Sequence, residues 1–141
     1  MNKILIASDH AGFKLKEVIK KYLNKKKYKF FDLGPSKIAK VDYPDFAHKL
    51  SKKIHQNSKL TGILICGSGT GMAMTANKYK KVRAALCYDL KSTKLSRLHN
   101  NANIITLGSR LTKKNLAIKC VGIFLSTKFE GGRHQKRIKK I

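Results

Sequence analysis

A short glycine-rich segment follows an apolar run near the middle of the chain. The run that starts at Gly62 ends on the thiol of Cys66, and the next residues are Gly67, Ser68, Gly69, Thr70 and Gly71. We expect this loop to lead into a helix, where its backbone N–H groups can converge on an anion. A cysteine beside a helix N-terminus has its thiolate favoured. Cys66 is therefore a candidate base or nucleophile.

The glycine spacing does not match the common nucleotide-binding motifs. Gly67, Gly69 and Gly71 form the pattern G-x-G-x-G. Dinucleotide-binding proteins instead use G-x-G-x-x-G, and phosphate loops use G-x-x-x-x-G-K-[ST]. The sequence thus gives little support for a nucleotide cofactor. The alternative to an anion-binding loop is a loop whose glycines serve only to make a tight turn.

Histidines and arginines gather in segments that we expect to form loops or helix ends. They include three histidines and three of the five arginines: His10, His99, His134, Arg110, Arg133 and Arg137. Imidazoles can act as acids and bases near neutral pH. Because lysine supplies nearly all the other positive charge, we expect these arginines to serve where a planar bidentate donor is needed, as in phosphate binding.

These groups favour one kind of reaction over others. The sequence has no histidine and cysteine spacing typical of a metal site, and no Ser-His-Asp arrangement with a nucleophile-elbow signature. It does contain an activatable thiol, a loop of backbone amides, imidazoles and a phosphate clamp. A metal-free proton transfer on a small phosphorylated molecule fits this set better than hydrolysis or redox chemistry.

The elements that must position these groups follow from the hydrophobic pattern. Apolar runs alternate with amphipathic stretches, which is typical of parallel strands buried on both faces by crossover helices. The predicted strands cover residues 4–7, 28–33, 62–66, 83–87 and 104–107, and the predicted helices cover 13–23, 44–57, 72–78, 90–98 and 112–125. We expect a single domain, 1–141, with a Rossmann-like three-layer α/β fold and a five-stranded parallel sheet.

Two further expectations follow from this fold class. Binding sites in open parallel sheets lie outside the carboxyl ends of the strands, where Asp9, Cys66 and the loop before Arg110 are expected. The C-terminal helical tail, about residues 127–141, has no place in the sheet. We expect this tail to lie in a subunit interface or to close a site.

The charge of the chain raises a different possibility. Lysine and arginine number 32 against 7 acidic residues, a formal net charge of +25. Such a balance can indicate nucleic-acid binding, but the chain has no RNP signature, helix-turn-helix or aromatic-rich basic patch. Most of the charge is lysine on predicted helix exteriors and turns, as a bias in residue usage would produce. We therefore expect no specific nucleic-acid partner, and keep a basic nucleic-acid-binding protein as the alternative from another functional class.

Composition also bears on the cellular setting. At 141 residues with 42% hydrophobic residues, the chain can form a real core, which argues against disorder. No apolar run approaches the ~20 residues of a membrane-spanning helix, so no membrane partner is expected. The three cysteines form no C-x-x-C pair, and a reducing, cytoplasmic location is the simplest inference.

Six segments, in the same order, resemble the family of type B ribose-5-phosphate isomerases and galactose-6-phosphate isomerase subunits. These segments are 8–12, 42–45, 62–72, 96–103, 107–110 and 129–134. The resemblance implies interconversion of D-ribose 5-phosphate and D-ribulose 5-phosphate through a cis-enediol, without a metal or an organic cofactor. Close relatives act on six-carbon phosphates, so allose 6-phosphate and galactose 6-phosphate are alternative substrates.

The resemblance also implies roles for individual residues. Cys66 would be the base that moves a proton between C2 and C1, Ser68 would help to move the proton between the substrate oxygens, and His99, with Asp9 nearby, would open the furanose ring. Substrate-binding positions, which surround the enediolate or hold sugar hydroxyls, are Gly67, Gly69, Thr70, Gly71, Tyr43 and Asn100. Phosphate-binding positions are His10, Arg110, Arg133, His134 and Arg137. Family members are homodimers or homotetramers with shared active sites.

Overall fold

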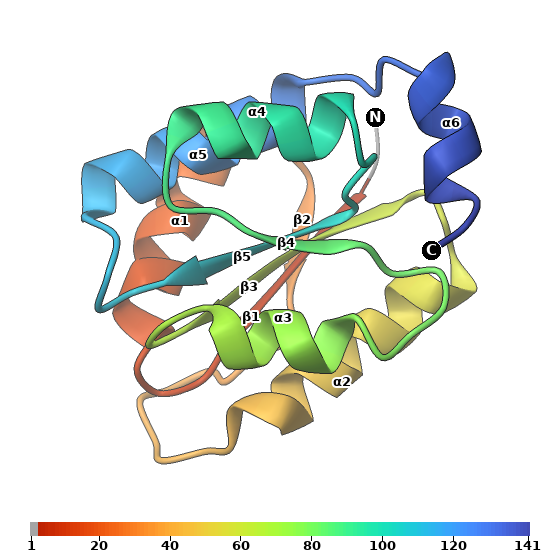
Figure 1. Cartoon of the computed structure of the whole chain (residues 1–141). Coiled ribbons are helices and arrows are strands. Elements are labelled where there is room, and N and C mark those ends of the chain that lie inside the picture. The colour runs from red at the N-terminus through yellow and green to blue at the C-terminus, as the bar shows by residue number, and fades with distance from the viewer. Residues whose placement is uncertain (1–2) are drawn as a thin grey trace.

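The computed structural model describes residues 3–141, so Met1 and Asn2 of the predicted domain lie outside it (Figure 1). The described residues form a five-stranded sheet in which every pair of neighbouring strands is parallel. The strands are β1 (Lys3–Ser8), β2 (Phe30–Asp32), β3 (Leu60–Cys66), β4 (Ala84–Leu86) and β5 (Ile104–Gly108), in the spatial order β2-β1-β3-β5-β4. This confirms the predicted Rossmann-like sheet.

Helices cover both faces of the sheet. They are α1 (Phe13–Lys25), α2 (Tyr43–Gln56), α3 (Thr70–Ala76), α4 (Leu90–Leu98), α5 (Lys114–Ser126) and α6 (Arg133–Ile138). Helices α1 and α5 pack on one face, α2 and α3 pack on the other, and α4 lies beside α5. Among residues 3–141, no helix combines the length and the apolar composition needed to cross a bilayer.

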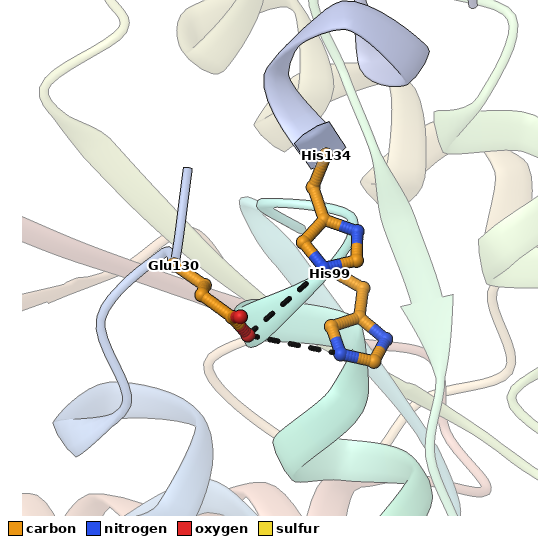
Figure 2. Close-up of side chains that lie close together, drawn as sticks. All are labelled: His99, Glu130 and His134. Carbon is orange, nitrogen blue, oxygen red and sulfur yellow. Dashed lines mark ion pairs between the residues drawn. The ribbon is translucent and has the colours of Figure 1, made fainter. Parts of the chain in front are cut away.

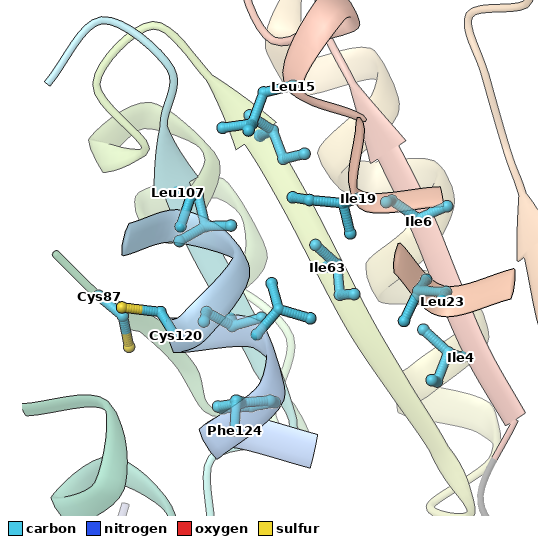
Figure 3. Packing of buried hydrophobic residues seen from close by; sticks show 14 of the residues in the cluster. Ile4, Ile6, Leu15, Ile19, Leu23, Ile63, Cys87, Leu107, Cys120 and Phe124 are labelled. Atoms are coloured by element: carbon cyan, nitrogen blue, oxygen red, sulfur yellow. The ribbon is translucent and has the colours of Figure 1, made fainter. Parts of the chain in front are cut away.

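Alternation of side chains along the strands divides the core into two clusters. On β1, Ile4 and Ile6 face α1 and α5, whereas Leu5 and Ala7 face α2 and α3. The first cluster also holds Ile63 and the other side chains labelled in Figure 3. Both faces of the central strands are thus buried, which is why these strands read as continuous apolar runs in the sequence.

Two of the three cysteines belong to this core. Cys87 and Cys120 are fully buried in the cluster between the sheet and α5 (Figure 3). Burial raises the pKa of both thiols, because the apolar surroundings disfavour the charged thiolate. Both side chains therefore act as small apolar groups, as a buried cysteine usually does.

A buried ion pair joins α1 to the end of β2. The Nζ atom of Lys16, which is fully buried, donates to both carboxylate oxygens of Asp32 at 2.8 and 2.9 Å and to the carbonyl of Pro35. Lys20 Nζ donates to the same carboxylate at 2.7 Å, and the Gly34 N–H donates at 2.9 Å. These contacts fix the start of the segment that leads to α2 and the candidate site.

The C-terminal tail lies outside the sheet, as the sequence predicts. Its N–H at Glu130 donates to the carbonyl of Leu98 at 3.1 Å, which attaches the tail to the end of α4. Helix α6 then begins at Arg133 after two glycines with positive φ, and Figure 1 shows it at the periphery of the molecule. The tail is therefore held to the part of the molecule where α4 ends.

Candidate active site

A shallow cavity of about 370 Å³ opens at the carboxyl ends of β1 and β3. Its lining is Asp9, Tyr43, Cys66, Gly67, Ser68, Gly71, Arg110 and Leu111. Seven of these eight residues are among the positions predicted from the sequence. The parallel sheet brings them together because the loops after β1, β3 and β5 leave it at the same edge.

The thiol of Cys66 is held by the loop that follows it. Cys66 ends β3 and is buried, and the N–H of Gly69 donates to its Sγ at 3.1 Å. Gly69 has a φ of +78°, and a Cβ there would lie 2.8 Å from the carbonyl carbon of Leu107. Only glycine can therefore turn the loop so tightly that this amide meets the sulfur. The hydrogen bond holds the sulfur against the loop.

Gly67 and Ser68, the first residues of the loop, line the cavity. Neither the N–H of Gly67 nor that of Ser68 has an acceptor within residues 3–141. The Oγ of Ser68 accepts a hydrogen bond from the Thr70 N–H at 3.2 Å, and its side chain is exposed. This leaves two backbone donors beside the thiol for an oxyanion, which is the arrangement expected of a site that stabilises developing negative charge.

Two larger side chains flank the loop. The Tyr43 ring approaches Gly71 so closely that a Cβ there would lie 2.5 Å from ring atoms. The Arg110 guanidinium covers Gly67, where a Cβ would lie 3.1 Å from Nη1, and the Arg110 N–H donates to the Gly67 carbonyl at 3.0 Å. A planar cation and a phenol therefore line the same cavity as the thiol, and these groups can bind a phosphate and a hydroxyl.

Asp9 and His10 complete this half of the site. Asp9 is buried, and its Oδ1 accepts the Gly12 N–H at 2.9 Å, which fixes the carboxylate at the end of β1. His10 is exposed, and its Nδ1 accepts the Val41 N–H at 3.3 Å. Both predicted residues therefore lie in the loop after β1, with Asp9 in the cavity wall.

The remaining predicted site residues lie at the opposite end of the sheet. They are His99, Asn100, Arg133, His134 and Arg137. Helix α4 starts after β4 and runs back toward the amino ends of the strands, so His99 and Asn100 directly precede the amino end of β5. There the Gly62 N–H donates to the carbonyl of Asn103 at 2.8 Å. The expected proximity of His99 to Asp9 is therefore not found within one chain, because a helix that crosses the sheet separates them.

This second group centres on two stacked histidines. The rings of His99 and His134 have centroids 4.2 Å apart and planes that differ by 13°. The Oε2 atom of Glu130 lies 3.8 Å from His99 Nε2 and 4.0 Å from His134 Nε2 (Figure 2). Burial lowers the pKa of the His134 ring; the charges of His99, Arg133 and Arg137 add to this effect, and Glu130 opposes it.

The sequence has no spacing typical of a metal site and indicates no role for Glu130, yet these three residues could hold a metal ion. Their potential ligand atoms all lie within 4.8 Å of one another. The only signal in the sequence is the spacing of four residues between Glu130 and His134, and Glu130 precedes the helix. His99, 31 positions before Glu130, reaches them only through the fold.

The chain is similar to known proteins along nearly its full length. A sequence model of the Ribose/Galactose Isomerase family matches residues 4–141. The chain belongs to this family. It is 50% identical over 140 residues to a Mycoplasma genitalium protein named as a probable ribose-5-phosphate isomerase B, covering 98% of this chain and 92% of that one. It is 38% identical to the Escherichia coli ribose-5-phosphate isomerase B, and this match covers 100% of this chain and 95% of that one.

Solved structures of ribose/galactose isomerase family members share the fold closely. A crystal structure of ribose-5-phosphate isomerase B from Mycoplasma genitalium, with bound ribulose 5-phosphate, matches with a TM-score of 0.95 and 49% identity, covering 98% of this chain and 92% of that one. The structure of a ribose 5-phosphate isomerase from Thermotoga maritima matches with a TM-score of 0.94 and 50% identity, covering 99% of this chain and 96% of that one. The family resemblance deduced from six sequence segments is thus confirmed along nearly the full length.

Proposed function

We propose that this chain is an aldose–ketose isomerase that interconverts D-ribose 5-phosphate and D-ribulose 5-phosphate. The observation that carries the proposal is the Cys66 thiol, which lies in a cavity beside free loop amides and the Arg110 guanidinium. Relatives at 38% to 50% identity named ribose-5-phosphate isomerase B, and the structure of one of them with ribulose 5-phosphate, support the choice of substrate.

The reaction needs one proton to move between two neighbouring carbons. The thiolate of Cys66 takes the proton from C2 of the open-chain aldose, and the C1 carbonyl becomes an enediolate. The N–H groups of Gly67 and Ser68 stabilise the charge on that oxygen, where fixed donors contribute most to the rate. The Ser68 hydroxyl moves a proton between O1 and O2, and the thiol returns its proton to C1. These steps require no metal or organic cofactor.

The proposal includes a site shared between subunits of a homodimer or homotetramer. Within residues 3–141, no imidazole lines the cavity around Cys66, and Arg110 is the single arginine in its lining. The missing groups lie at the other end of the sheet in the same chain, where His99 and Asn100 directly follow α4 and Arg133, His134 and Arg137 belong to α6. A second subunit would bring His99 toward Asp9 and Asn100 toward the sugar. The α6 residues would join His10 and Arg110 at the phosphate.

The test follows ribulose 5-phosphate formation from ribose 5-phosphate by chelator-treated protein, with allose 6-phosphate and galactose 6-phosphate assayed in parallel. We expect kcat/KM to be highest for the five-carbon substrate. A higher kcat/KM for either hexose phosphate would assign the site to that substrate instead, and no turnover of any of the three would reject the isomerase function. A cytoplasmic setting is part of the proposal, supported by three cysteines that are all free thiols.

A further inference from the structure

The cluster of His99, Glu130 and His134 has a donor set suited to a transition-metal ion. Two imidazole nitrogens and one carboxylate form a common set of protein ligands for Zn²⁺. Imidazole also suits Ni²⁺ and Cu²⁺, whereas Mg²⁺ and Ca²⁺ prefer oxygen ligands alone. The three side chains come from the end of α4, the loop before α6 and the first turn of α6 (Figure 2).

A second observation points into the same cluster. His134 is buried, with only 6% of its side chain exposed, and its Nε2 has no hydrogen-bond partner within residues 3–141. Leaving a buried polar atom unpaired costs about 1 to 3 kcal/mol. This atom lies 4.0 Å from the Glu130 carboxylate, which is too far for a hydrogen bond. Its position fits a ligand that is placed between the two groups.

Two of the three donor pairs are close enough for one ion to bridge them, and the two histidine donors lie within 4.8 Å of each other. A Zn²⁺ ion binds nitrogen and carboxylate oxygen at about 2.0 to 2.2 Å, so two donors of the same ion can be at most about 4.4 Å apart. The pairs that include Glu130 measure 3.8 and 4.0 Å. The His99 ring must tilt out of its stack to aim at the ion. Its side chain is 37% exposed and that of Glu130 is 54% exposed, so both have room to move.

The surrounding backbone holds the ligands in place. The Glu130 N–H donates to the Leu98 carbonyl, next to His99, and this bond ties two ligands together. The His134 N–H donates to the Gly131 carbonyl at 3.1 Å and fixes the turn between Glu130 and α6. The ligand backbones are therefore preorganised, which reduces the entropy cost of binding.

We propose that His99, Glu130 and His134 form a binding site for a divalent transition-metal ion of the zinc type. The ion is not a cofactor of the isomerase. The bound ion would engage the Nε2 atom of His99, so we expect it to inhibit the isomerase reversibly. This inhibition rests on the proposed function, whereas metal binding itself does not.

The test measures metal binding directly on the full-length protein after treatment with a chelator and its removal. Zn²⁺ is titrated in competition with a chromophoric chelator, and Co²⁺ is added separately to look for visible ligand-field bands. We expect one ion per chain. Glu130→Gln keeps the side-chain size but removes the charged ligand. It should weaken Zn²⁺ binding by at least tenfold, since even the loss of an outer-shell partner costs about 10- to 100-fold.

Matched variants separate this site from other histidines. His134→Asn should weaken binding as Glu130→Gln does, whereas His55→Asn on α2 should leave it unchanged; circular dichroism checks that each variant is folded. Equal Zn²⁺ affinity of the wild type, Glu130→Gln and His134→Asn would overturn the proposal, as would a dependence on His55. Chelator-reversible inhibition of turnover by Zn²⁺ supports the functional consequence. An inactive protein that still binds one Zn²⁺ would reject the proposed function and leave the metal site standing.

Discussion

Cys66 differs from the other two cysteines through its immediate neighbours. All three thiols are buried, but only Cys66 ends a strand at the cavity and accepts an amide hydrogen bond, from Gly69. Cys87 and Cys120 lie among apolar side chains that raise their pKa. The loop geometry around Cys66, rather than its exposure, therefore distinguishes this thiol from the other two.

Replacing Cys66 with alanine removes the proposed base and leaves the rest of the cavity lining unchanged. We expect kcat to fall by about 10²- to 10⁴-fold, the range typical of a lost general base, while substrate binding measured by calorimetry is largely retained. The control is Cys87→Ala, which removes a thiol of equal size and should leave kcat unchanged. A Cys66→Ala enzyme with wild-type turnover would show that another group is the base.

At the scale of elements, the Lys16–Asp32 pair decides how the segment before α2 is held. Burial alone would raise the pKa of the Asp32 carboxyl, but hydrogen bonds from Lys16, Lys20 and the Gly34 N–H outweigh burial and lower this pKa. The pair anchors the chain between β2 and α2, and α2 begins at Tyr43 beside the candidate site.

Asp32→Ala should destabilise the fold because it leaves the fully buried Lys16 ammonium without its counter-ion. We expect a loss of about 3 kcal/mol in the free energy of unfolding at pH 7, the lower end of the usual cost of breaking a buried ion pair. The lowered pKa means that Asp32 stabilises the fold above about pH 4 and that this contribution is lost as pH falls through the folded-state value. The difference between wild type and variant, measured by urea unfolding, should therefore shrink as the solution is acidified.

The matched control removes both charges. Lys16→Met combined with Asp32→Ala should be more stable than Asp32→Ala alone, because no uncompensated charge stays buried. A double variant as unstable as the single variant, or a difference that grows in acid, would contradict this account of the pair.

At the scale of the whole molecule, the predicted site residues divide between the two ends of the sheet. The cavity with Cys66 opens at the carboxyl ends of the strands, and His99 lies at the amino end of β5. A twofold axis repeats every contact between two chains, so a dimer that brings one end of a chain against the other end of its partner does so twice. The proposed assembly thus supplies both halves of two identical sites.

Mixing two inactive variants tests this arrangement. Cys66→Ala and His99→Asn should each be inactive alone, whereas co-refolded chains should recover activity. In a mixed dimer one site has both wild-type residues, so random pairing gives about a quarter of the wild-type turnover. Mixed chains that stay inactive, with dimers verified by light scattering, would contradict a site that combines Cys66 of one chain with His99 of its partner.

The sequence by itself determined the fold class and the residue types of the site. Its apolar runs are continuous because the central strands are buried on both faces, so the parallel sheet was readable from periodicity. The loop after Cys66 was readable because a strand, glycines and a helix adjoin in the chain. Edge strand β2 proved shorter than the predicted 28–33, because Tyr28 bonds back to Leu23 in the turn after α1.

Only the tertiary structure decided which of these residues meet. Nothing local shows that α4 carries His99 to the far end of the sheet, or that Glu130 faces both histidines. The full burial of Lys16 was likewise hidden, because lysine on an amphipathic helix is normally exposed and only Asp32 and Pro35 make its burial possible. Periodicity reports which face of an element is buried, whereas contacts between distant segments depend on how the elements are packed.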